Sequence, residues 1–367
     1  MPPVYDGEES MDRLPTSFGP YTLLRSLGQG GMAQAYLAWR QGSEGIDHYV
    51  CIKTILKTHH HSDYFVRHFE REAKLISRLR HANITQLLEF GTVDGQKFLA
   101  LELIDGLDLG KLLTRIRAKH HALPSELVHY IAVQVTYALE CAHRARFRDR
   151  DTPILHRDIS PSNIFIGCNG NVKLGDFGIA KTLDVGATIL TEDLQAKGKT
   201  PYMAPEYMRG EPFTPQADLY SLGVTLYELL AGVRPFDAQR TVQIFEKASQ
   251  GLFTPLSDAA PHAAKPLATI VETLIAANPA HRFASTTALL DALSAMPMSV
   301  LAPRELGQLV EAYQLADEKL RYAGPAESNA HDGLGTFEAG AEEGVESHTQ
   351  STLKDIVEGH RTKVDRP

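Results

Sequence analysis

Alternating apolar and polar residues predict a β-rich first part of the chain. Residues 21–36 are typical of a strand, a glycine turn and a second strand, and residues 49–53 form a short β-branched run. Two more strands are predicted over 84–90 and 97–103, joined by a turn. Between these strands, residues 65–80 carry apolar side chains at helical spacing. The pattern therefore predicts a small sheet with one helix.

From Leu109 onwards the apolar positions follow helical spacing instead. The residues after Pro124 are typical of a helix start, and the helical pattern continues to about Ala145. A last amphipathic helix is predicted over 302–322. Its packing face would consist of Leu306, Leu309, Val310 and Tyr313. The chain is thus predicted to be mainly helical after its β-rich beginning.

The composition is that of an ordinary soluble globular protein. Of the 367 residues, 43% are hydrophobic and 22% are charged, and the net charge of −8 gives no basic surface for nucleic acid. No stretch reaches the roughly 18 apolar residues of a membrane span. The three cysteines are far apart and show no Cys-x-x-Cys spacing. A reducing cytoplasm is the simplest interpretation.

Both ends of the chain differ from its middle. Residues 1–17 are acidic and polar, without the apolar run of a signal peptide, and are expected to be a flexible lead-in. Residues 323–367 are rich in Gly, Glu, Ser and Thr, with nine acidic and four basic residues. We expect a disordered acidic tail there. An interaction role and an inert one both stay open for it.

The strongest chemical signal is the octet from His156 to Asn163. Its Asp158 and Asn163 can place a carboxylate beside an incoming hydroxyl and an amide oxygen on a metal ion, which suits phosphoryl transfer. Asp176 follows eighteen residues after Asp158 in an Asp-Phe-Gly triplet, and Glu206 follows thirty residues later in an Ala-Pro-Glu triplet. Three motifs in this order and spacing are improbable by chance.

These motifs resemble those of the bacterial eukaryotic-like (Hanks-type) Ser/Thr protein kinases. The resemblance covers roughly residues 18–301. It implies an α+β, bilobal protein-kinase-like fold, with a small β-rich N-lobe and one long helix over 18–104 and a larger, mainly helical C-lobe over 105–301. It further implies transfer of the γ-phosphate of ATP to Ser or Thr hydroxyls of proteins, with Mg²⁺ or, in its place, Mn²⁺. Neither nucleic acid nor a membrane is an implied partner, and self-association for autophosphorylation is left open.

The resemblance assigns the catalytic roles residue by residue. Asp158 would accept or orient the proton of the substrate hydroxyl, while Asn163 and Asp176 would hold the metal ions. Lys53 would reach the α- and β-phosphates. Glu72, nineteen residues further on and in the predicted helix, would pair with Lys53. The alternative for Glu72 is a surface residue on a charged helix.

A glycine turn and a small hydrophobic roof are predicted around the nucleotide. Gly28 and Gly30 would let backbone amides approach the phosphates, although the third glycine of the family pattern is Ala33 here. Because side chains alternate along a strand, Cys51 shares a face with Lys53 and would lie over the adenine. A small buried residue is the alternative for Cys51. The implied nucleotide contacts are Leu27, Gly28, Gly30, Ala35, Cys51, Lys53, Leu101, Glu102, Ile104 and Phe165.

Two further positions resemble residues that support the family's catalytic loop. Asp218 resembles the helix Asp that holds this loop by its backbone, and Arg282 resembles the Arg that pairs with Glu206. Both would be structural. The loop itself departs from the pattern, because Ser160 replaces the usual Lys and Ser162 stands where tyrosine kinases have an Arg. No side chain of this loop therefore supplies a cation to the γ-phosphate, and Lys181 and Lys199 are the cations available nearby.

Regulation by phosphorylation is also predicted. Arg157 places a cation beside the catalytic Asp, where a phosphorylated activation segment could dock. Thr191 is the first candidate for phosphorylation, followed by Thr188 and Thr200. In the alternative interpretation, Arg157 pairs with an acidic residue such as Glu192.

Two other functions compete with a protein kinase. A pseudokinase scaffold that binds nucleotide with little or no transfer is suggested by Ser160 and Ala33. A small-molecule kinase of the aminoglycoside phosphotransferase type shares the catalytic-loop pattern. It is opposed by Arg157 and by the long segment between Asp176 and Glu206.

Overall fold

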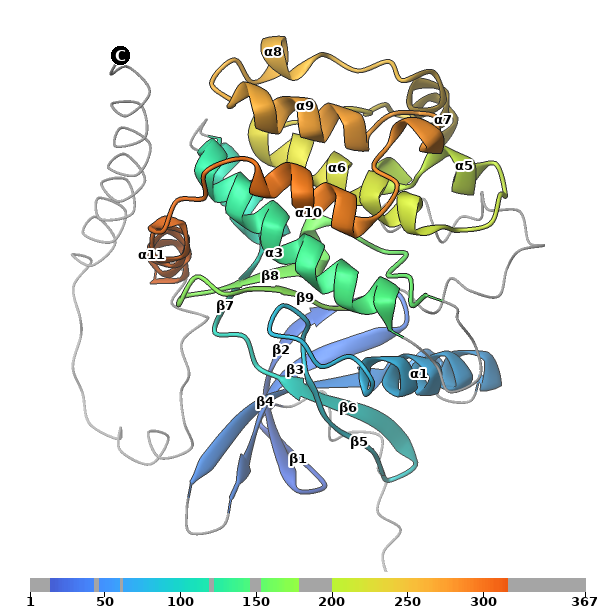
Figure 1. Ribbon diagram of the computed structural model, residues 1–367. Helices are drawn as coiled ribbons and strands as arrows, with labels where there is room; N and C mark the ends of the chain where they lie inside the picture. Colours follow the sequence, from blue (N-terminus) through green and yellow to red (C-terminus); the bar gives the residue numbers. More distant parts are fainter. Residues whose placement is uncertain are drawn as a thin grey trace, which may run out of the picture.

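The computed structural model describes residues 14–42, 46–59, 62–118, 122–145, 153–177 and 200–315, which form two lobes (Figure 1). The smaller lobe is a six-stranded sheet with one helix, and the larger lobe is mainly helical. A three-stranded sheet of the larger lobe lies at the boundary with the smaller one. The predicted α+β, bilobal fold is confirmed.

The N-lobe sheet has the strand order β1-β2-β3-β4-β6-β5, and all its neighbouring strands are antiparallel. Its strands are β1 (Thr16–Phe18), β2 (Tyr21–Gln29), β3 (Ala33–Gln41), β4 (Asp47–Ile55), β5 (Leu87–Val93) and β6 (Gln96–Glu102). Asp94 and Gly95 both have positive φ at the β5–β6 turn, as a two-residue hairpin turn of type I′ requires. The strand predicted from residue 84 starts only at Leu87, because Ile84 forms a single parallel bridge with Leu174 of the other lobe.

The two faces of this sheet bury different residues. Val50 and Ile52 of β4 belong to an outer cluster with Phe98 and other aromatic residues. Cys51 packs on the opposite face, against a cluster that includes Phe69 of helix α1 (Asp63–Ile76). The alternation predicted along β4 is therefore confirmed, and it places Cys51 and Lys53 on the face that carries α1.

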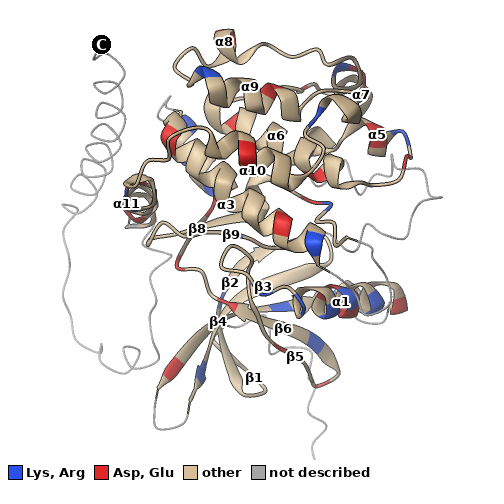
Figure 2. Ribbon diagram, viewed as in Figure 1, with Lys and Arg blue, Asp and Glu red and all other residues tan. Residues whose placement is uncertain are grey.

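Helix α1 is amphipathic. Phe69 and Ala73 pack against the sheet residues Ile55, Leu99 and Leu101. The rest of the helix carries acidic and basic side chains in mixed order, and charges of both signs are spread over both lobes (Figure 2). Only one face of α1 is thus fixed by packing, and that face holds it against β4 and β6.

The C-lobe is organised around helix α6. Every residue of α6 from Ala217 to Leu230 is buried, because apolar residues occur on all sides of the helix and its buried Asp218 and Glu228 have bonding partners. The described helices of this lobe are α2 (Leu109–Ala118), α3 (Ser125–Arg144), α5 (Pro205–Met208), α6 (Pro215–Ala231), α7 (Thr241–Gln250), α8 (Leu256–Ala259), α9 (Lys265–Leu274), α10 (Thr286–Ser294) and α11 (Ala302–Leu315). Its sheet consists of β7 (Gly106–Asp108), β8 (Ile164–Gly167) and β9 (Val172–Leu174).

The last described helix, α11, lies within the predicted range 302–322. The four residues predicted as its packing face, Leu306, Leu309, Val310 and Tyr313, are all buried in the main hydrophobic core. Residues 1–13 and 316–367, which contain most of the predicted lead-in and the whole predicted tail, lie outside the described part of the chain. Among the described helices, none combines the length and the apolar composition needed to cross a membrane.

Candidate active site

The turn between β2 and β3 carries Gly28 and Gly30. The N–H of Gly30 donates to the Ala33 carbonyl at 2.8 Å, which closes the turn. A Cβ added to Gly28 would meet no protein atom within 4 Å, and neither glycine has a positive φ. The fold itself therefore does not require Gly28. A phosphate group bound close to the backbone would require it, because a side chain would obstruct its approach to the amides.

Lys53 lies between two carboxylates from different segments. Its Nζ is 2.7 Å from Glu72 Oε1 on α1 and 2.8 Å from Asp176 Oδ1, in the segment that follows β9. The side chains of Lys53 and Glu72 are only 16% and 12% exposed, whereas that of Asp176 is 42% exposed. The buried pair fixes the ammonium group, and Asp176 is the partner that faces solvent and can turn towards a ligand.

The electrostatics of this cluster keep the lysine charged. Burial alone would lower the pKa of Lys53, but the carboxylates of Asp176 and Glu72 outweigh this effect and raise the pKa above its usual value. Burial raises the pKa of Glu72, and the charge of Lys53 opposes this rise. Because the two groups share a short charge-assisted hydrogen bond, the ion pair is the form that fits the geometry. The ammonium group is therefore available to an anionic ligand at neutral pH.

Asp158 and Asn163 are joined within the catalytic loop. The amide nitrogen of Asn163 donates to the Asp158 carbonyl oxygen at 2.7 Å and to its carboxylate Oδ2 at 2.9 Å. Asn163 is buried and ends a short 3-10 turn, Pro161–Asn163. The first bond fixes the backbone of Asp158, and the second orients its carboxylate. Since they use the amide nitrogen, the atom of Asn163 that could ligate a metal is the amide oxygen.

The buried carboxylate of Asp218 on α6 holds the backbone of the catalytic loop at its first two residues. It accepts hydrogen bonds from the backbone N–H groups of His156 at 2.9 Å and Arg157 at 2.8 Å, as the sequence predicted. It also accepts one from Nε2 of His143 at 2.8 Å. Arg157 has φ of 65°, a conformation that costs a non-glycine residue about 1–3 kcal/mol. The bonds to Asp218 help offset this strain. His143 was not predicted, since its sequence context gives no sign of this contact.

The segment that carries Asp176 is tied to the same loop. The buried ring of His156 donates from Nε2 to the Gly175 carbonyl at 3.0 Å, and it lies 4.5 Å from the ring of Phe177. Asp176 has a positive φ of 54°. The predicted catalytic base and the predicted metal ligand are therefore held in one connected unit. Gly178, which completes the predicted triplet, lies outside the described residues.

The segment that joins the lobes carries the predicted adenine contacts. Leu101 is buried and lies opposite Cys51 in the sheet register. The Glu102 side chain accepts from Nζ of Lys173 on β9 at 2.7 Å and from the backbone N–H of Gln86 at 2.7 Å. The side chain of Glu102 is thus engaged within the protein, and its backbone N–H donates to the Gln86 carbonyl at 3.0 Å, so a backbone contact of Glu102 with a nucleotide would use its carbonyl oxygen. Lys173 was missed, but it stands opposite the predicted adenine floor, Phe165, in the β8–β9 pairing.

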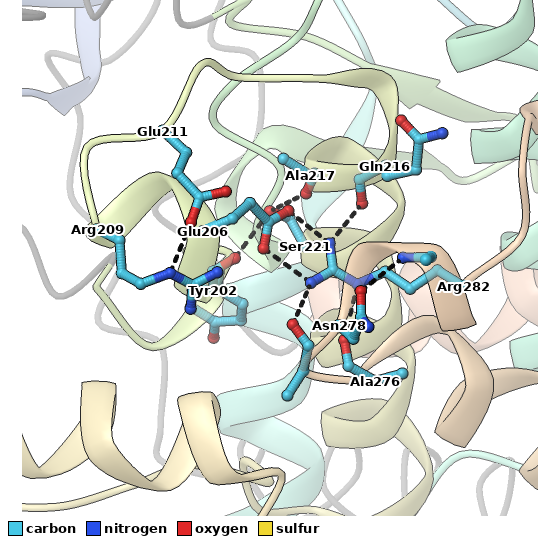
Figure 3. Close-up of polar contacts among 12 residues, drawn as sticks. Tyr202, Glu206, Arg209, Glu211, Gln216, Ala217, Ser221, Ala276, Asn278 and Arg282 are labelled. Atoms are coloured by element: carbon cyan, nitrogen blue, oxygen red, sulfur yellow. Dashed lines mark hydrogen bonds and ion pairs between the residues drawn. The ribbon is translucent and has the colours of Figure 1, made fainter.

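A buried ion pair anchors the end of the activation segment, and Figure 3 shows its surroundings. Arg282 donates from Nη1 and Nη2 to the two carboxylate oxygens of Glu206 at 2.6 and 2.8 Å. The guanidinium also bonds three backbone carbonyls and stacks over the Tyr220 ring at 4.6 Å. The predicted pairing of Arg282 with Glu206 is confirmed, and it lies far from solvent.

The structure describes only some of the residues singled out in the catalytic loop and in the activation segment, which is the stretch between Asp176 and Glu206. Ser160, which replaces the family's Lys, is only 2% exposed, and its Oγ lies 3.1 Å from Oγ of Ser162. Thr200 is buried at the start of a 3-10 turn, Thr200–Tyr202. The other residues named for this segment, Lys181, Thr188, Thr191, Glu192 and Lys199, lie outside the described residues.

The donor set fits a magnesium nucleotide better than a metal held by protein alone. Within the described ranges there is no group of three or more His, Cys, Asp or Glu side chains that could hold a metal ion. Asp176 and Asn163 offer one carboxylate and one amide oxygen. Mg²⁺ is commonly bound by one or two carboxylates together with substrate phosphates and waters, so two protein ligands beside a phosphate site suit it.

Comparisons with known proteins agree with this geometry. The protein kinase domain family matches residues 21–293. The chain is 35% identical over 277 residues to "Tyrosine-protein kinase MasK" of Myxococcus xanthus, covering 75% of this chain and 43% of that protein. It is 34% identical over 267 residues to "Serine/threonine-protein kinase PrkC" of Bacillus subtilis, covering 72% and 38% respectively. The chain thus spans less than half the length of these curated relatives.

A solved structure gives the same result for the fold. The kinase domain of Mycobacterium tuberculosis PknI is 28% identical, with a TM-score of 0.55, and the match covers 77% of this chain and 97% of that one. The family match takes in the glycine turn, the Lys53 cluster, the catalytic loop and the Glu206–Arg282 pair. This chain therefore belongs to the protein kinase domain family.

Proposed function

We propose that the chain transfers the γ-phosphate of ATP to serine or threonine hydroxyls of protein substrates. The observation that carries this proposal is the position of Lys53 between Glu72 and Asp176. Three segments of the chain meet there, and they place two carboxylates within 2.8 Å of one ammonium group. A site that no longer bound a magnesium nucleotide would not need this arrangement.

The residues around the cluster divide the work of phosphoryl transfer. Adenine would lie between the roof formed by Ala35 and Cys51 and the floor formed by Phe165, with the backbone of Glu102 and Ile104 at its edge. Lys53 would bind the α- and β-phosphates, and the glycine turn would cover them. Asp176 and Asn163 would hold Mg²⁺, which supplies charge neutralisation on the phosphates when bound.

The protein itself handles the proton of the acceptor. The Asp158 carboxylate, oriented by Asn163, would accept or orient the hydroxyl proton as the oxygen attacks phosphorus. Asp218 keeps the loop in place through two backbone N–H groups. Positioning of this kind supplies much of the rate enhancement in phosphoryl transfer.

Serine and threonine are proposed as acceptors rather than tyrosine. Ser162 occupies the position at which tyrosine kinases have an Arg, although one relative is named a tyrosine kinase and another a serine/threonine kinase. Phosphoamino acid analysis of the product decides between them. Phosphotyrosine as the main product would contradict the proposed acceptor class while leaving phosphoryl transfer intact.

The proposed substrates include the chain's own activation segment. Arg157 is partly buried, its guanidinium lies 5.8 Å from the Phe213 ring, and burial lowers its pKa. A phosphate on Thr191 or Thr188 would be a suitable anionic partner for it. Thr200 is less suitable because it is buried. Mass spectrometry of active protein that finds no phosphate between residues 182 and 200 would contradict this part of the proposal.

Incubation of the purified protein with ATP, Mg²⁺ and a generic protein acceptor tests transfer directly. We expect wild-type protein to label the acceptor and Asp158→Asn to lose nearly all of this activity while still binding nucleotide. A wild-type protein that binds ATP but transfers nothing would instead support the pseudokinase alternative, which the buried Ser160 keeps open.

A further inference from the structure

Helix α11 lies outside the matched kinase domain but packs against its centre. The family match ends at residue 293, and α11 spans Ala302–Leu315. In Figure 1 it lies beside the ends of β7 and β8, and it contacts both strands as well as α2 and α3. Its apolar face is fully buried in the main hydrophobic core. This helix is therefore an integral part of the folded domain.

The contact between α11 and the β8–β9 turn is unusually close. A Cβ on Gly307 of α11 would lie 2.3 Å from the Cys168 carbonyl oxygen, which no real Cβ tolerates. On the other side, a Cβ on Gly170 would lie 1.8 Å from the carbonyl oxygen of Pro303. Two glycines thus let backbone pack directly on backbone. Any larger residue would have to push α11 away from the turn.

Polar contacts connect α11 to the end of the hinge, which is the segment around Glu102 and Ile104 that joins the lobes. Gln314 accepts a hydrogen bond from Sγ of Cys168 at 2.8 Å and donates from Nε2 to Oδ1 of Asp105 at 2.9 Å. The backbone carbonyl of Asp105 in turn accepts from the Cys168 N–H at 2.8 Å. Arg115 of α2 donates to the Tyr313 carbonyl at 2.9 Å. Gln314 therefore links Asp105, at the end of the hinge, to Cys168, which directly follows β8.

Those two segments carry the proposed nucleotide site. Asp105 directly follows Ile104, whose backbone is a proposed adenine contact, and Phe165 of β8 is the proposed adenine floor. In the strand register Asp108 of β7 lies opposite Phe165. The strands approach so closely that a Cβ on Gly106 would lie 1.9 Å from the Ile166 carbonyl oxygen. Displacement of the β7–β8 unit would thus move the floor relative to the hinge.

We propose that α11 is a clamp that sets nucleotide affinity, with Gln314 and Gly307 as positioning residues. The helix holds β7 and β8 in the arrangement that seats adenine, without touching the nucleotide. This inference rests on the proposed function in one respect, namely that ATP is the ligand. Because the clamp acts on the adenine end and not on Asp158, its loss weakens binding and leaves the rate of the bound complex nearly unchanged.

Exchange of the amide and carboxylate groups between positions 314 and 105 tests the Gln314 contact. Gln314→Glu replaces the donor facing Asp105 with a carboxylate, and we expect the Kd for ATP to rise roughly fivefold, the size of one hydrogen bond. Asp105→Asn alone should have little effect, because an amide oxygen still accepts from Gln314. Combined with Gln314→Glu, it restores a donor and acceptor pair and should return the Kd to near the wild-type value.

A second variant tests the backbone contact. Gly307→Ala forces the helix away from Cys168, and we expect the Kd and KM for ATP to rise by about tenfold, with kcat changed by less than about twofold. The matched control is Gln308→Ala, the neighbouring residue on the exposed face of the same helix. Melting curves show whether each variant is folded. If Gly307→Ala does not fold, the ATP affinities of the Gln314 and Asp105 variants alone test the proposal.

Direct binding of a fluorescent ATP analogue to the full chain distinguishes a failure of the α11 clamp from a failure of the proposed function. Unchanged affinity in folded Gln314→Glu and Gly307→Ala would overturn the clamp, as would a fall in kcat at unchanged affinity. A double variant that stays as weak as Gln314→Glu would also count against it. A wild-type chain that binds no ATP analogue would overturn the proposed function and this inference with it.

Discussion

Lys53 obtains its properties from two residues far from it in the sequence. Glu72 comes from α1, nineteen residues away, and Asp176 from a different lobe, 123 residues away. Their carboxylates raise the pKa of the lysine although burial alone would lower it. Without these partners, a lysine on a strand of a small sheet would be an ordinary cation that solvent or burial controls. Its proposed role depends on this pair of partners.

The first prediction concerns this cluster. Lys53→Met and Asp176→Asn should each reduce transfer by at least 10² to 10³-fold, because a preorganised charged contact to the phosphates or metal is lost. Both variants should remain folded, as circular dichroism can show. The matched control is Lys97→Met, which removes another lysine paired with α1, 3.0 Å from Glu70. Wild-type rates in either site variant would contradict the assignment.

Lys53→Met should also change the pH dependence of stability. Burial already raises the pKa of Glu72, and loss of the lysine removes the charge that opposes this rise. A carboxyl whose folded-state pKa is raised stabilises the fold below its unfolded value, near 4.3, and that stability is lost as the pH rises through the folded pKa. Lys53→Met should therefore be more destabilising at pH 8 than at pH 5 in urea unfolding. Equal losses at both values would contradict a buried, charged Glu72.

Cys51 allows a chemical test of the adenine roof. Burial, followed by the charge of Asp176, raises the pKa of this thiol to about 12. Because the thiolate is the reactive form, we expect alkylation to be slow at pH 8 and to accelerate towards pH 12. A thiol-reactive adenine analogue should still label Cys51 slowly, since it is held beside the thiol, and ATP should protect. Labelling that ignores ATP would place Cys51 in the core instead.

At the scale of elements, the C-lobe is held by contacts between helices and loops that are distant in sequence. Glu206 is the second residue of α5, and Arg282, which precedes α10, donates to the Gln216 carbonyl of α6. The ion pair they form is bidentate and excluded from water. A short helix such as α5 has little stability alone, so this pair fixes its position.

The next prediction compares two ion pairs that Figure 3 shows close together. Glu206→Gln leaves Arg282 buried without its anion and should cost about 3–5 kcal/mol of unfolding free energy. Glu211→Gln removes the partner of Arg209, whose ion pair is 2.7 Å long but 40% and 52% exposed. That variant should cost less than about 1 kcal/mol. If urea unfolding gave similar losses of unfolding free energy for the two variants, burial would not be what sets the contribution of these ion pairs to stability.

At the scale of the whole molecule, the two lobes meet through a few specific contacts. Lys53 reaches Asp176, Glu102 accepts from Lys173, and the backbone of Thr85 bonds that of Leu174. The first two of these contacts involve residues of the proposed nucleotide site. A nucleotide bound there would touch both lobes at once and stabilise their arrangement.

We therefore expect ATP with Mg²⁺ to raise the melting temperature of the full chain. At a ligand concentration of 100 times Kd the gain is about 2.7 kcal/mol, equivalent to several degrees. Removal of the metal with EDTA should abolish most of this shift, and Lys53→Met should reduce it. A shift that is unaffected by EDTA would contradict the proposed roles of Asp176 and Asn163.

The sequence by itself determined the fold class, the alternating faces of β4, the buried face of α11 and the order of the catalytic motifs. The two buried faces are local features, because periodicity within one segment specifies them, whereas the fold class was predicted through the family resemblance that the ordered motifs carry. The Glu206–Arg282 contact and the contacts of Asp218 were also predicted, because these residues match positions that have the same contacts in the family that the sequence resembles. The strand predicted from residue 84 was wrong in its start, because a bridge to another lobe competes with local propensity.

Only the tertiary structure decided the contacts of His143, Lys173 and Gln314. Each is an ordinary polar residue in its own segment, and its partner lies 75, 71 or 146 residues away. The close approach of Gly307 to Cys168 is equally invisible in the sequence, because a helix glycine has no local requirement there. Packing between elements sets which polar groups meet, and it is this packing that turns a spaced set of motifs into a site.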